Sequence, residues 1–324
     1  MTKGKWHGQK SIKKKLSYLV MLLTISIFLS CVIYLAGGPK ENKNQAAGPQ
    51  GPNVRIFLSK EDKVVTLPME EVLMGVLAAE MPASFEMSAL EAQAVAARTY
   101  IMRRMDEPWG VGSGHADSDI CDDPAHCQAY INKEAMQEKW GSNFETYYNK
   151  ISQAVQNTAG QVLSFDGELI EALYHSTCGG QTEDGGKPYL VSVPCFWDTE
   201  APKYESKVIF TANELKELLN VSSKELAAIQ ITSRSASGRV TGLSCGEKIF
   251  TGSKIRELLG LNSTNFAWLA AVNGSEEEYI FTVQGYGHGI GLCQNGANGM
   301  AKEGKSAAEI LLYYYQGAEI EKKY

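Results

Sequence analysis

Basic residues are scarce in this 324-residue sequence once its first fifteen positions are set aside. The chain holds 31 lysines and arginines, six of them before residue 16, and 37 aspartates and glutamates, so the remainder carries 25 basic against 37 acidic residues, a net charge of −12. Proteins that bind nucleic acid gather positive charge on their contact surface. The acidic remainder therefore argues against a nucleic-acid partner, and it is compatible with a neutral glycan.

Several common signatures are also absent. The glycine-rich segment 285–297, GYGHGIGLCQNGA, does not open a helix with G-x-G-x-x-G ahead of a downstream acid, so it is not a phosphate-binding fingerprint. The aspartates of 117–123 come without the glycine and the distal glutamate of an EF-hand, which argues against calcium. No segment of the chain repeats.

A charge-free apolar run at 16–36 follows a basic segment at 1–15. The run has about the length that a helix needs to span a bilayer, and the lysines before it place the N-terminal end in the cytoplasm. A cleaved signal peptide is the alternative, but its apolar region would be shorter, about 7–15 residues, with a better cleavage site. We therefore expect an uncleaved transmembrane helix and a single-pass cell-membrane protein whose remainder lies outside the cytoplasm.

The rest of the chain divides into a linker and a large ectodomain. Residues 37–53 are rich in Gly, Pro, Asn and Gln without an apolar pattern, which predicts a flexible linker. Residues 54–324 are enough to bury a large core, and their predicted helices and strands interleave irregularly, which favours an α+β fold. We expect an elongated ectodomain of mixed helices and antiparallel hairpins, with a substrate cleft and a secondary lobe at about 208–261.

Local patterns place the individual elements. Hairpins are expected for the strand pairs 54–58 with 64–67 and 160–165 with 169–174, the second around Asp166-Gly167. Helices are expected at 69–80, 88–105, 134–140, 149–158, 213–219 and 306–315. Two S-x-x-E sequences, Ser88 with Glu91 and Ser306 with Glu309, predict capping boxes.

One carboxylate lies on the apolar stripe of the predicted helix 69–80. Leu73, Val76 and Leu77 have the spacing of one helical face, and Glu80 takes the next position on it. A carboxyl group there loses water, which disfavours its charged form and raises its pKa. A carboxyl that stays protonated near neutral pH is what a general acid needs.

An ion pair is the structural alternative for Glu80. A partly buried glutamate paired with Arg98 or Arg103 would also have a perturbed pKa, because structural ion pairs shift pKa values as catalytic sites do. The pattern by itself leaves both interpretations open.

The loop 110–130 places four metal-ligating side chains within thirteen residues: His115, Cys121, His126 and Cys127. Zn²⁺ binds nitrogen and sulfur ligands tetrahedrally, and four protein ligands make a closed structural site. The spacing matches no common zinc finger. A Cys121–Cys127 disulfide, or free cysteines beside solvated histidines, are the alternatives, but a loop with little apolar content needs a clip, so we expect Zn²⁺ in a structural role.

Two polar, glycine-containing segments, 175–183 (HSTCGGQTE) and 285–297, follow predicted strands and are candidate walls of the substrate cleft. Ordinary loops or a twisted hairpin with a solvated histidine are the alternatives. The side chains that we expect to contact sugar hydroxyl and acetamido groups are His288, Gln294, Thr182 and Gln181. Pairing among the other ectodomain cysteines cannot be chosen from the sequence.

Three segments, 75–100, 175–183 and 285–297, resemble the signature blocks of the stage II sporulation protein D family, and the resemblance covers most of 54–320. The basic N-terminal end, single span and outer region are similar too. The family often has Lys where Glu91 stands and Ser where Cys293 stands. The His/Cys cluster resembles a zinc-binding subset of its anaerobic members.

The resemblance implies a membrane-anchored lytic transglycosylase, a lyase of the cell wall. It would cleave the MurNAc–GlcNAc β-1,4 bond of peptide-stripped peptidoglycan and leave 1,6-anhydroMurNAc ends. It would act in forespore engulfment during sporulation, in the mother-cell membrane facing the forespore, with a cell-wall amidase as partner. The catalytic glutamate of the family matches Glu80.

Two other functions remain open at this stage. Relatives of these signature blocks include proteins thought to enhance wall amidases, so the chain could instead be a non-catalytic glycan-binding enhancer of an amidase. The His/Cys cluster could also be the active site of a zinc hydrolase.

Overall fold

The computed structural model describes residues 51–106, 115, 117–273 and 276–324. The chain divides into the units Met1–Gly48 and Pro49–Tyr324. The basic segment 1–15, the apolar run 16–36 and most of the linker 37–53 therefore lie outside the described residues. Within the described part, every helix is too short or too polar to cross a membrane.

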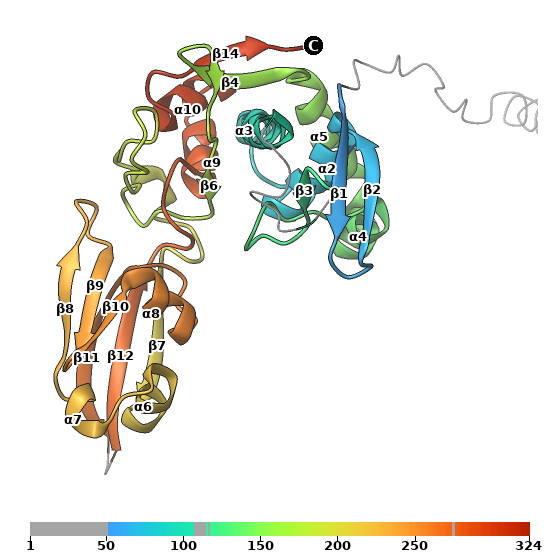
Figure 1. The fold of residues 1–324 in the computed structure, drawn as a ribbon. Helices are drawn as coiled ribbons and strands as arrows, with labels where there is room; N and C mark the ends of the chain where they lie inside the picture. The colour runs from blue at the N-terminus through green and yellow to red at the C-terminus, as the bar shows by residue number, and fades with distance from the viewer. Residues whose placement is uncertain (1–50, 107–114, 116, 274–275) are drawn as a thin grey trace, which may run out of the picture. The chain divides into compact units, whose positions relative to one another are not determined.

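Helix α3 (Met87–Asp106) forms the centre of the first hydrophobic core. Its alanines are buried on several faces, which is typical of a helix surrounded by other elements, because small side chains let neighbours approach closely. Its neighbours are α2 (Met69–Glu80), α5 (Phe144–Asn157), α9 (Gln294–Lys302), α10 (Ala307–Tyr314) and β4 (Gln161–Phe165). Figure 1 shows α2 and α5 on one side of α3 and α9 and α10 on the other.

Short strands surround this core. The strands are β1 (Asn53–Leu58), β2 (Lys63–Pro68), β3 (Ile120–Cys121), β5 (Glu168–Leu169), β6 (Tyr174–His175), β13 (Leu292–Cys293) and β14 (Glu319–Lys322). The first predicted hairpin is confirmed, because β1 pairs antiparallel with β2. The second is confirmed at its turn, where β4 pairs antiparallel with β5, but its predicted strand 169–174 is wrong beyond Leu169. Asp166 and Gly167, at φ 52° and 81°, make the turn between β4 and β5. The pairs β1–β3 and β6–β13 are parallel.

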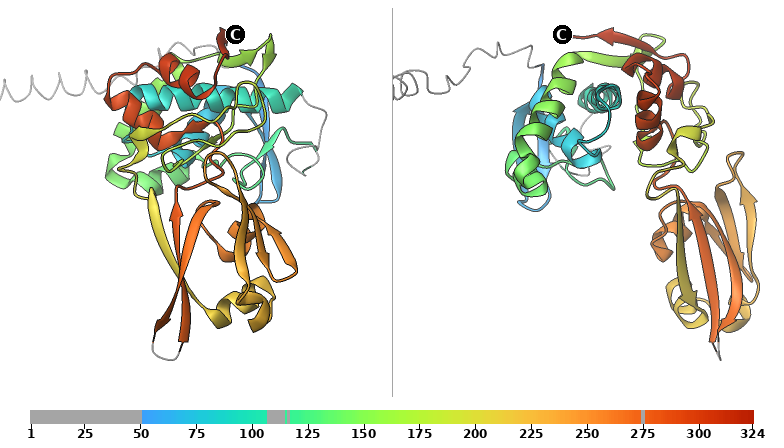
Figure 2. Two further views of the ribbon diagram at one scale, coloured as in Figure 1. Left: turned by 90° about the vertical axis from the view of Figure 1, so that its left-hand side faces the viewer. Right: turned by 180° about the vertical axis from the view of Figure 1, so that it is seen from behind.

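A second core forms between Leu215 and Val283. Its elements are β7 (Glu205–Thr211), α6 (Ala212–Leu219), α7 (Ser223–Leu226), β8 (Ile229–Arg234), β9 (Val240–Cys245), β10 (Lys248–Thr251), α8 (Gly252–Leu259), β11 (Asn265–Asn273) and β12 (Glu276–Gln284). They build two antiparallel sheets, β10-β9-β8 and β11-β12-β7 (Figure 2). The long hairpin β11–β12 extends this core beyond the expected segment 208–261. The α+β class is confirmed.

The helix boundaries show where local signals succeed. The capping box of Ser306 and Glu309 is present, as predicted. The predicted box of Ser88 and Glu91 is wrong, because α3 already begins at Met87 and the Glu91 carboxylate accepts a hydrogen bond from Asn157 instead, at 2.7 Å.

Tertiary contacts fix the start of α3. The Glu86 carbonyl accepts from the N–H groups of Ala89 and Leu90, and the Glu86 N–H donates to the Asn298 side chain of α9 at 2.8 Å.

Helix α5 begins at Phe144, earlier than the predicted 149. It follows η1 (Gly141–Asn143) and α4 (Lys133–Trp140), the latter close to its predicted range.

A buried ion pair ties the first core together. The Arg98 guanidinium, with none of its side chain exposed, contacts a carboxylate oxygen of Glu70 at 2.6 Å. It also donates to the carbonyls of Gln161 and Val155. The Tyr324 hydroxyl donates to Glu70 at 2.6 Å. One cation thus joins α2, α3, α5, β4 and the C-terminal end.

Removing this cation is expected to destabilise the fold strongly. Arg98→Met leaves Glu70 without its cationic partner and two carbonyls without their donor, and breaking a buried pair typically costs about 3–5 kcal/mol. Lys254→Met is the matched control, because Lys254 forms an exposed pair with Glu257 at 2.8 Å, and exposed pairs contribute about 1 kcal/mol or less. Urea unfolding measures both; equal losses in the two variants would contradict the role given to Arg98.

Candidate functional site

Glu80 lines a cavity of about 720 Å³, a volume in the range of small-molecule sites. The lining comes from α2, α3, the loop after Cys121, the chain around β6 and the glycine-rich segment. Its residues are Ala79, Glu80, Tyr100, Arg104, Pro124, Ala125, His126, Cys127, Gln128, Ala172, Leu173, Tyr174, His175, Ser176, Arg256, Tyr286, Gly287, His288 and Gln294. Glu80 is the single acidic side chain among the described residues that line it.

The end of α2 presents Glu80 to this cavity. Met81 leaves the helix with extended backbone, at φ −121° and ψ 146°, and Pro82 cannot continue it. The Ala129 N–H donates to Oε1 of Glu80 at 2.7 Å. The Gln294 side chain also forms a hydrogen bond with the Glu80 carboxyl. Two segments remote in sequence therefore hold this carboxyl in place.

Burial raises the pKa of Glu80 above its ordinary value, against the opposing effects of the Ala129 N–H, Gln294 and the charge of Lys139. The Lys139 ammonium acts on the Glu80 carboxyl through its charge. Its hydrogen bond goes to the Ala78 carbonyl, at 2.7 Å. Burial also lowers the pKa of Lys139. Loss of water is thus the dominant influence on Glu80, as the apolar stripe predicted.

The ion-pair alternative for Glu80 does not hold for Arg98, which pairs with Glu70. Arg103 donates to the Leu169 carbonyl of β5 at 2.8 Å. Both arginines lie on α3 but reach other partners. The hydrogen bonds that shift the pKa of Glu80 come from Ala129 and Gln294.

His288 and Gln294 lie on the cavity wall as expected from the sequence. Gln294 is 4% exposed and its amide also donates to Gln93 at 3.4 Å. The Ile290 N–H donates to Nδ1 of His288 at 3.0 Å, so Nε2 carries the proton and donates to the Tyr174 carbonyl at 3.0 Å. Both imidazole nitrogens are therefore engaged with backbone, and the ring is left as a rigid wall.

Thr182 and Gln181 lie outside this cavity. The buried Thr182 hydroxyl accepts from the Val193 N–H at 2.8 Å. The Gln181 amide donates to the Ser192 hydroxyl at 2.9 Å. The two side chains hold their own loop together, so the structure does not bring them to Glu80.

Two polar groups in the cavity lining were not expected from the sequence. The Tyr174 hydroxyl and Nε2 of His175 are buried without a hydrogen-bond partner in the described part of the chain. Nδ1 of His175 lies 3.1 Å from the Ile290 carbonyl, and burial lowers the pKa of this histidine, so its ring is neutral. Buried polar atoms rarely lack partners, but protein atoms enclose both of these, so a ligand would reach them only if neighbouring side chains moved. The position of His175 within the polar segment 175–183 was the only signal available.

The His/Cys loop forms another wall of the cavity. One ligand atom from each of His115, Cys121 and His126 lies within 4.8 Å of the others. Cys121 and Cys127 both carry free thiols, and their side chains are joined by a hydrogen bond. In a tetrahedral zinc site with bonds of about 2.0–2.3 Å, ligand atoms lie roughly 3.3–3.8 Å apart. The structure thus brings three of the four predicted ligands, His115, Cys121 and His126, within reach of one ion, and it does not place Cys127 in that group.

The aspartates of this loop have structural partners. Asp119 is bridged to Arg55, whose guanidinium lies 2.9 Å from Oδ1 and whose backbone N–H donates to Oδ2. Asp122 accepts from the Ser59 N–H at 2.9 Å. The His115 ring stacks on Phe57 with centroids 3.8 Å apart. His115, Asp119 and Asp122 are thus attached to β1 and the residue that follows it, and residues 124–128 line the Glu80 cavity.

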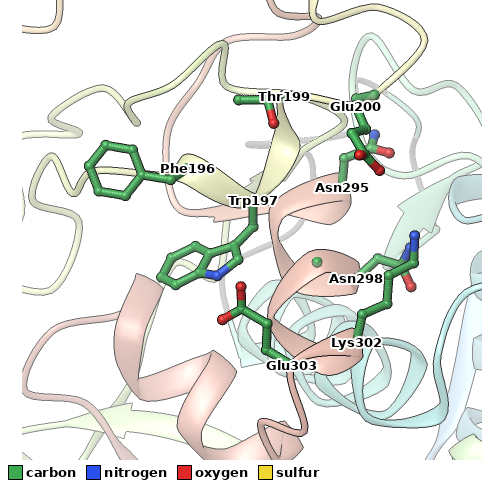
Figure 3. A pocket seen from close by; sticks show the side chains of 10 residues that line it. Phe196, Trp197, Thr199, Glu200, Asn295, Asn298, Lys302 and Glu303 are labelled. Atoms are coloured by element: carbon green, nitrogen blue, oxygen red, sulfur yellow. The ribbon is translucent and has the colours of Figure 1, made fainter.

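A smaller cavity, about 360 Å³, lies between η2 (Phe196–Asp198) and α9. Figure 3 shows Trp197 extending from η2 towards Glu303, with Phe196 turned away from it. The Trp197 ring packs edge-on against Tyr313 at 5.3 Å. The residues predicted from the sequence to be functional do not line this cavity.

Comparison with known proteins gives consistent matches. The family model described as stage II sporulation protein matches residues 58–165. Stage II sporulation protein D of Bacillus subtilis is 38% identical over 283 residues, covering 83% of this chain and 78% of the relative. Its counterpart in Bacillus amyloliquefaciens is 37% identical with the same coverage. An amidase enhancer of Bacillus subtilis is 27% identical over 306 residues, covering 76% of this chain and 40% of the relative.

The raised pKa of Glu80 predicts a pH-dependent cost to stability. The folded-state pKa lies above the ordinary value of 4.5, so ionisation disfavours the folded state and the free energy of unfolding falls as pH rises through this interval. Glu80→Gln stays neutral and keeps an oxygen for the Ala129 N–H. The variant should therefore melt higher than the parent at pH 8, by about 2–4 °C for each kcal/mol gained, and equally with it at pH 3.

Thermal unfolding of both chains from pH 3 to pH 8 measures this gap. Glu71→Gln, an exposed position on the same helix, is the matched control and should show no comparable change with pH. A Glu80→Gln gap that stays constant with pH, or a variant that melts lower at pH 8, would argue that Glu80 is ionised in the folded protein.

Proposed function

The chain belongs to the stage II sporulation protein D family, and from this membership together with the cavity around Glu80 we propose that it is a lytic transglycosylase of peptidoglycan. It cleaves the β-1,4 bond between MurNAc and GlcNAc and leaves 1,6-anhydroMurNAc ends. The observation that carries this proposal is a desolvated carboxyl that is the single acid among the described residues lining a sugar-sized cavity.

The number of carboxylates decides between classes of sugar-cleaving enzyme. Glycosidases that use water or a covalent intermediate employ two carboxylates at a defined separation. A lytic transglycosylase needs one, because the substrate's own hydroxyl group replaces water. Glu80 has no acidic companion in the described lining, which favours the single-acid mechanism.

In the proposed mechanism Glu80 acts first as acid and then as base. The protonated carboxyl donates its proton to the glycosidic oxygen while the bond to the anomeric carbon of MurNAc breaks. The resulting carboxylate then accepts the proton of the MurNAc C6 hydroxyl as its oxygen bonds to the anomeric carbon. This attack is intramolecular, so the hydroxyl is already close to its target.

The surrounding groups orient the acid and the sugar. The Ala129 N–H and the Gln294 side chain hold the Glu80 carboxyl. Tyr174 and His175 line the same cavity, but their partnerless hydroxyl and Nε2 are enclosed by protein atoms and would meet sugar groups only after a local shift. The His288 ring contributes a flat wall whose nitrogens are already engaged.

A Zn²⁺ ion held by His115, Cys121, His126 and Cys127 would have a structural task. Four protein ligands leave no open position for chemistry, so the ion would order the loop from which His126 and Cys127 line the cavity and Ala129 reaches Glu80. The positive charge of the ion would offset the negative charge of the two thiolates, and the two imidazoles would complete its coordination. Every proton transfer in the reaction belongs to Glu80.

The cellular setting completes the proposal. The apolar run 16–36 would anchor the protein in the mother-cell membrane, with the basic end in the cytoplasm and the catalytic region facing the forespore. A cell-wall amidase would remove stem peptides, and the exposed glycan strands would then be cut during engulfment.

The second candidate is a non-catalytic enhancer of a wall amidase, supported by the similarity to a protein that carries this name. Such a protein would bind glycan strands without turnover and would not depend on the protonation of Glu80. The raised pKa of Glu80 favours the enzyme, because a binding site gains nothing from a desolvated acid.

Replacing the acid tests the reaction. On peptide-free glycan strands the parent chain should release anhydro ends detectable by mass spectrometry, and Glu80→Gln should lower their rate by at least about 10²–10⁴-fold, the usual contribution of a general acid. Glu71→Gln should keep the parent rate. Strand binding without products in the parent would favour the enhancer, and near-parental turnover by Glu80→Gln would remove Glu80 from the mechanism.

Disrupting the His/Cys loop separates structural from catalytic zinc. Cys121→Ser should lose one equivalent of zinc relative to the parent, become sensitive to proteolysis between residues 115 and 129, and turn over about 10–100-fold more slowly, because small displacements of a catalytic group are costly. In a zinc hydrolase, a chelator would abolish activity before the loop becomes sensitive to protease. If the chelator removes activity and protease resistance at the same time, the ion is structural.

A further inference from the structure

Three cysteines and one aspartate form a second cluster of metal-ligating side chains away from the His/Cys loop. The ligand atoms of Cys178, Cys195, Asp198 and Cys293 all lie within 4.8 Å of one another. The three cysteines are 0% exposed and Asp198 is 1% exposed. Their thiols are free. The cluster is therefore dry and contains four donor atoms at the separation of a single ion's ligands.

These donors come from three separate segments of the chain. Cys178 follows β6, Cys195 is the N-cap of η2 and Asp198 its last residue, and Cys293 is the N-cap of α9. The Cys178 thiol lies 3.0 Å from Oδ2 of Asp198, and the Cys293 thiol lies 3.6 Å from the same oxygen. Folding, not sequence spacing, assembles the set.

The Asp198 carboxyl lacks sufficient partners for its burial. Oδ2 accepts from the Gly179 N–H at 2.9 Å, but Oδ1 is buried without a hydrogen-bond partner among the described residues. A buried carboxylate is costly unless it is paired or coordinates a metal. A cation at the centre of the cluster would satisfy it.

Groups around the cluster support the thiols as ligands. The N–H groups of Cys178 and Gly296 each donate to the Cys293 sulfur at 3.3 Å. The Tyr314 hydroxyl lies 3.2 Å from the Cys195 sulfur. Such outer hydrogen bonds orient metal ligands. A Cβ added at Gly296 would collide with the Cys195 sulfur and the Tyr314 hydroxyl, so the chain is built to fit closely around these atoms.

We propose that Cys178, Cys195, Cys293 and Asp198 bind one Zn²⁺ ion in a closed tetrahedral site. Thiolate ligands select zinc over calcium and magnesium, which prefer oxygen. A disulfide between two of the cysteines would leave the third thiol and a buried carboxyl unexplained, whereas one ion accounts for all four groups. Binding releases the thiol protons to solvent, and no oxidant is needed.

The proposed ion would lie behind the wall of the Glu80 cavity. Cys293 directly precedes Gln294, and Cys178 follows the strand that carries Tyr174 and His175. Phe196 and Trp197, the two residues between its ligands Cys195 and Asp198, line the smaller cavity drawn in Figure 3. The ion would fasten η2 to α9 and to the end of β6.

Metal analysis of the full-length chain tests the proposal. The parent should contain two equivalents of zinc, one for each cluster, and Cys195→Ser and Asp198→Asn should each contain one less. Cys245→Ser is the matched control, because Cys245 is a buried cysteine of the second core outside both clusters, and it should match the parent. Native mass spectrometry and elemental analysis give the zinc content independently of activity.

Cobalt substitution distinguishes the two clusters. In Cys121→Ser, which lacks the first site, added Co²⁺ should produce a thiolate-to-metal charge-transfer band, and Cys195→Ser introduced into the same chain should remove it. Retention of the band or of the zinc in a folded Cys195→Ser chain would overturn the proposal.

Measurements on the parent chain test the second zinc site even where a variant fails to fold. A parent with a single equivalent of zinc, which is lost in Cys121→Ser, overturns the second site. So does a mass deficit of two hydrogens in peptides that contain Cys178, Cys195 or Cys293, since it reveals a disulfide. A parent with two equivalents, and with these three thiols protected from alkylation until a chelator is added, supports it.

Discussion

The hydrogen bond from the Ala129 N–H to the Glu80 carboxyl joins the two parts of the molecule on which the proposed chemistry depends. The helix that carries Glu80 supplies a dry position, and the loop that carries Ala129 supplies a fixed donor. A carboxyl held by a backbone donor in an apolar setting keeps one orientation, while loss of water raises its pKa. Displacing either part would leave an acid that is wet or misdirected.

The first core serves this arrangement by holding α2 and α3 rigidly. Arg98 is fully buried and connects α2 to the segments behind it through Glu70 and two carbonyls. This pair has a structural task, and so two glutamates of α2 differ in role: Glu70 contacts the Arg98 guanidinium, whereas Glu80 faces the cavity without an arginine partner in direct contact. The two residues are both glutamates, so the difference in role comes from their surroundings.

Two cysteine-containing clusters flank the Glu80 cavity. The His/Cys loop contributes His126 and Cys127 to the lining, and the second cluster includes Cys293, next to Gln294, and Cys178, three residues after His175. Loops are mobile unless their backbone is tied down, and the acid must be positioned to within a fraction of an ångström. A metal ion bound at each of the two clusters would make the loops that line the cavity rigid.

The sequence by itself determined the local features: the two hairpins, the helix 69–80 and the placement of Glu80 on its apolar stripe. These depend on periodicity and turn residues, which act over a few positions. It did not determine the start of α3, which Asn298 fixes across the core, nor the separation of Thr182 from the cavity. The convergence of Cys178, Cys195 and Cys293 was likewise decided by tertiary structure, because contacts between segments far apart in the sequence leave no periodic signal in the chain.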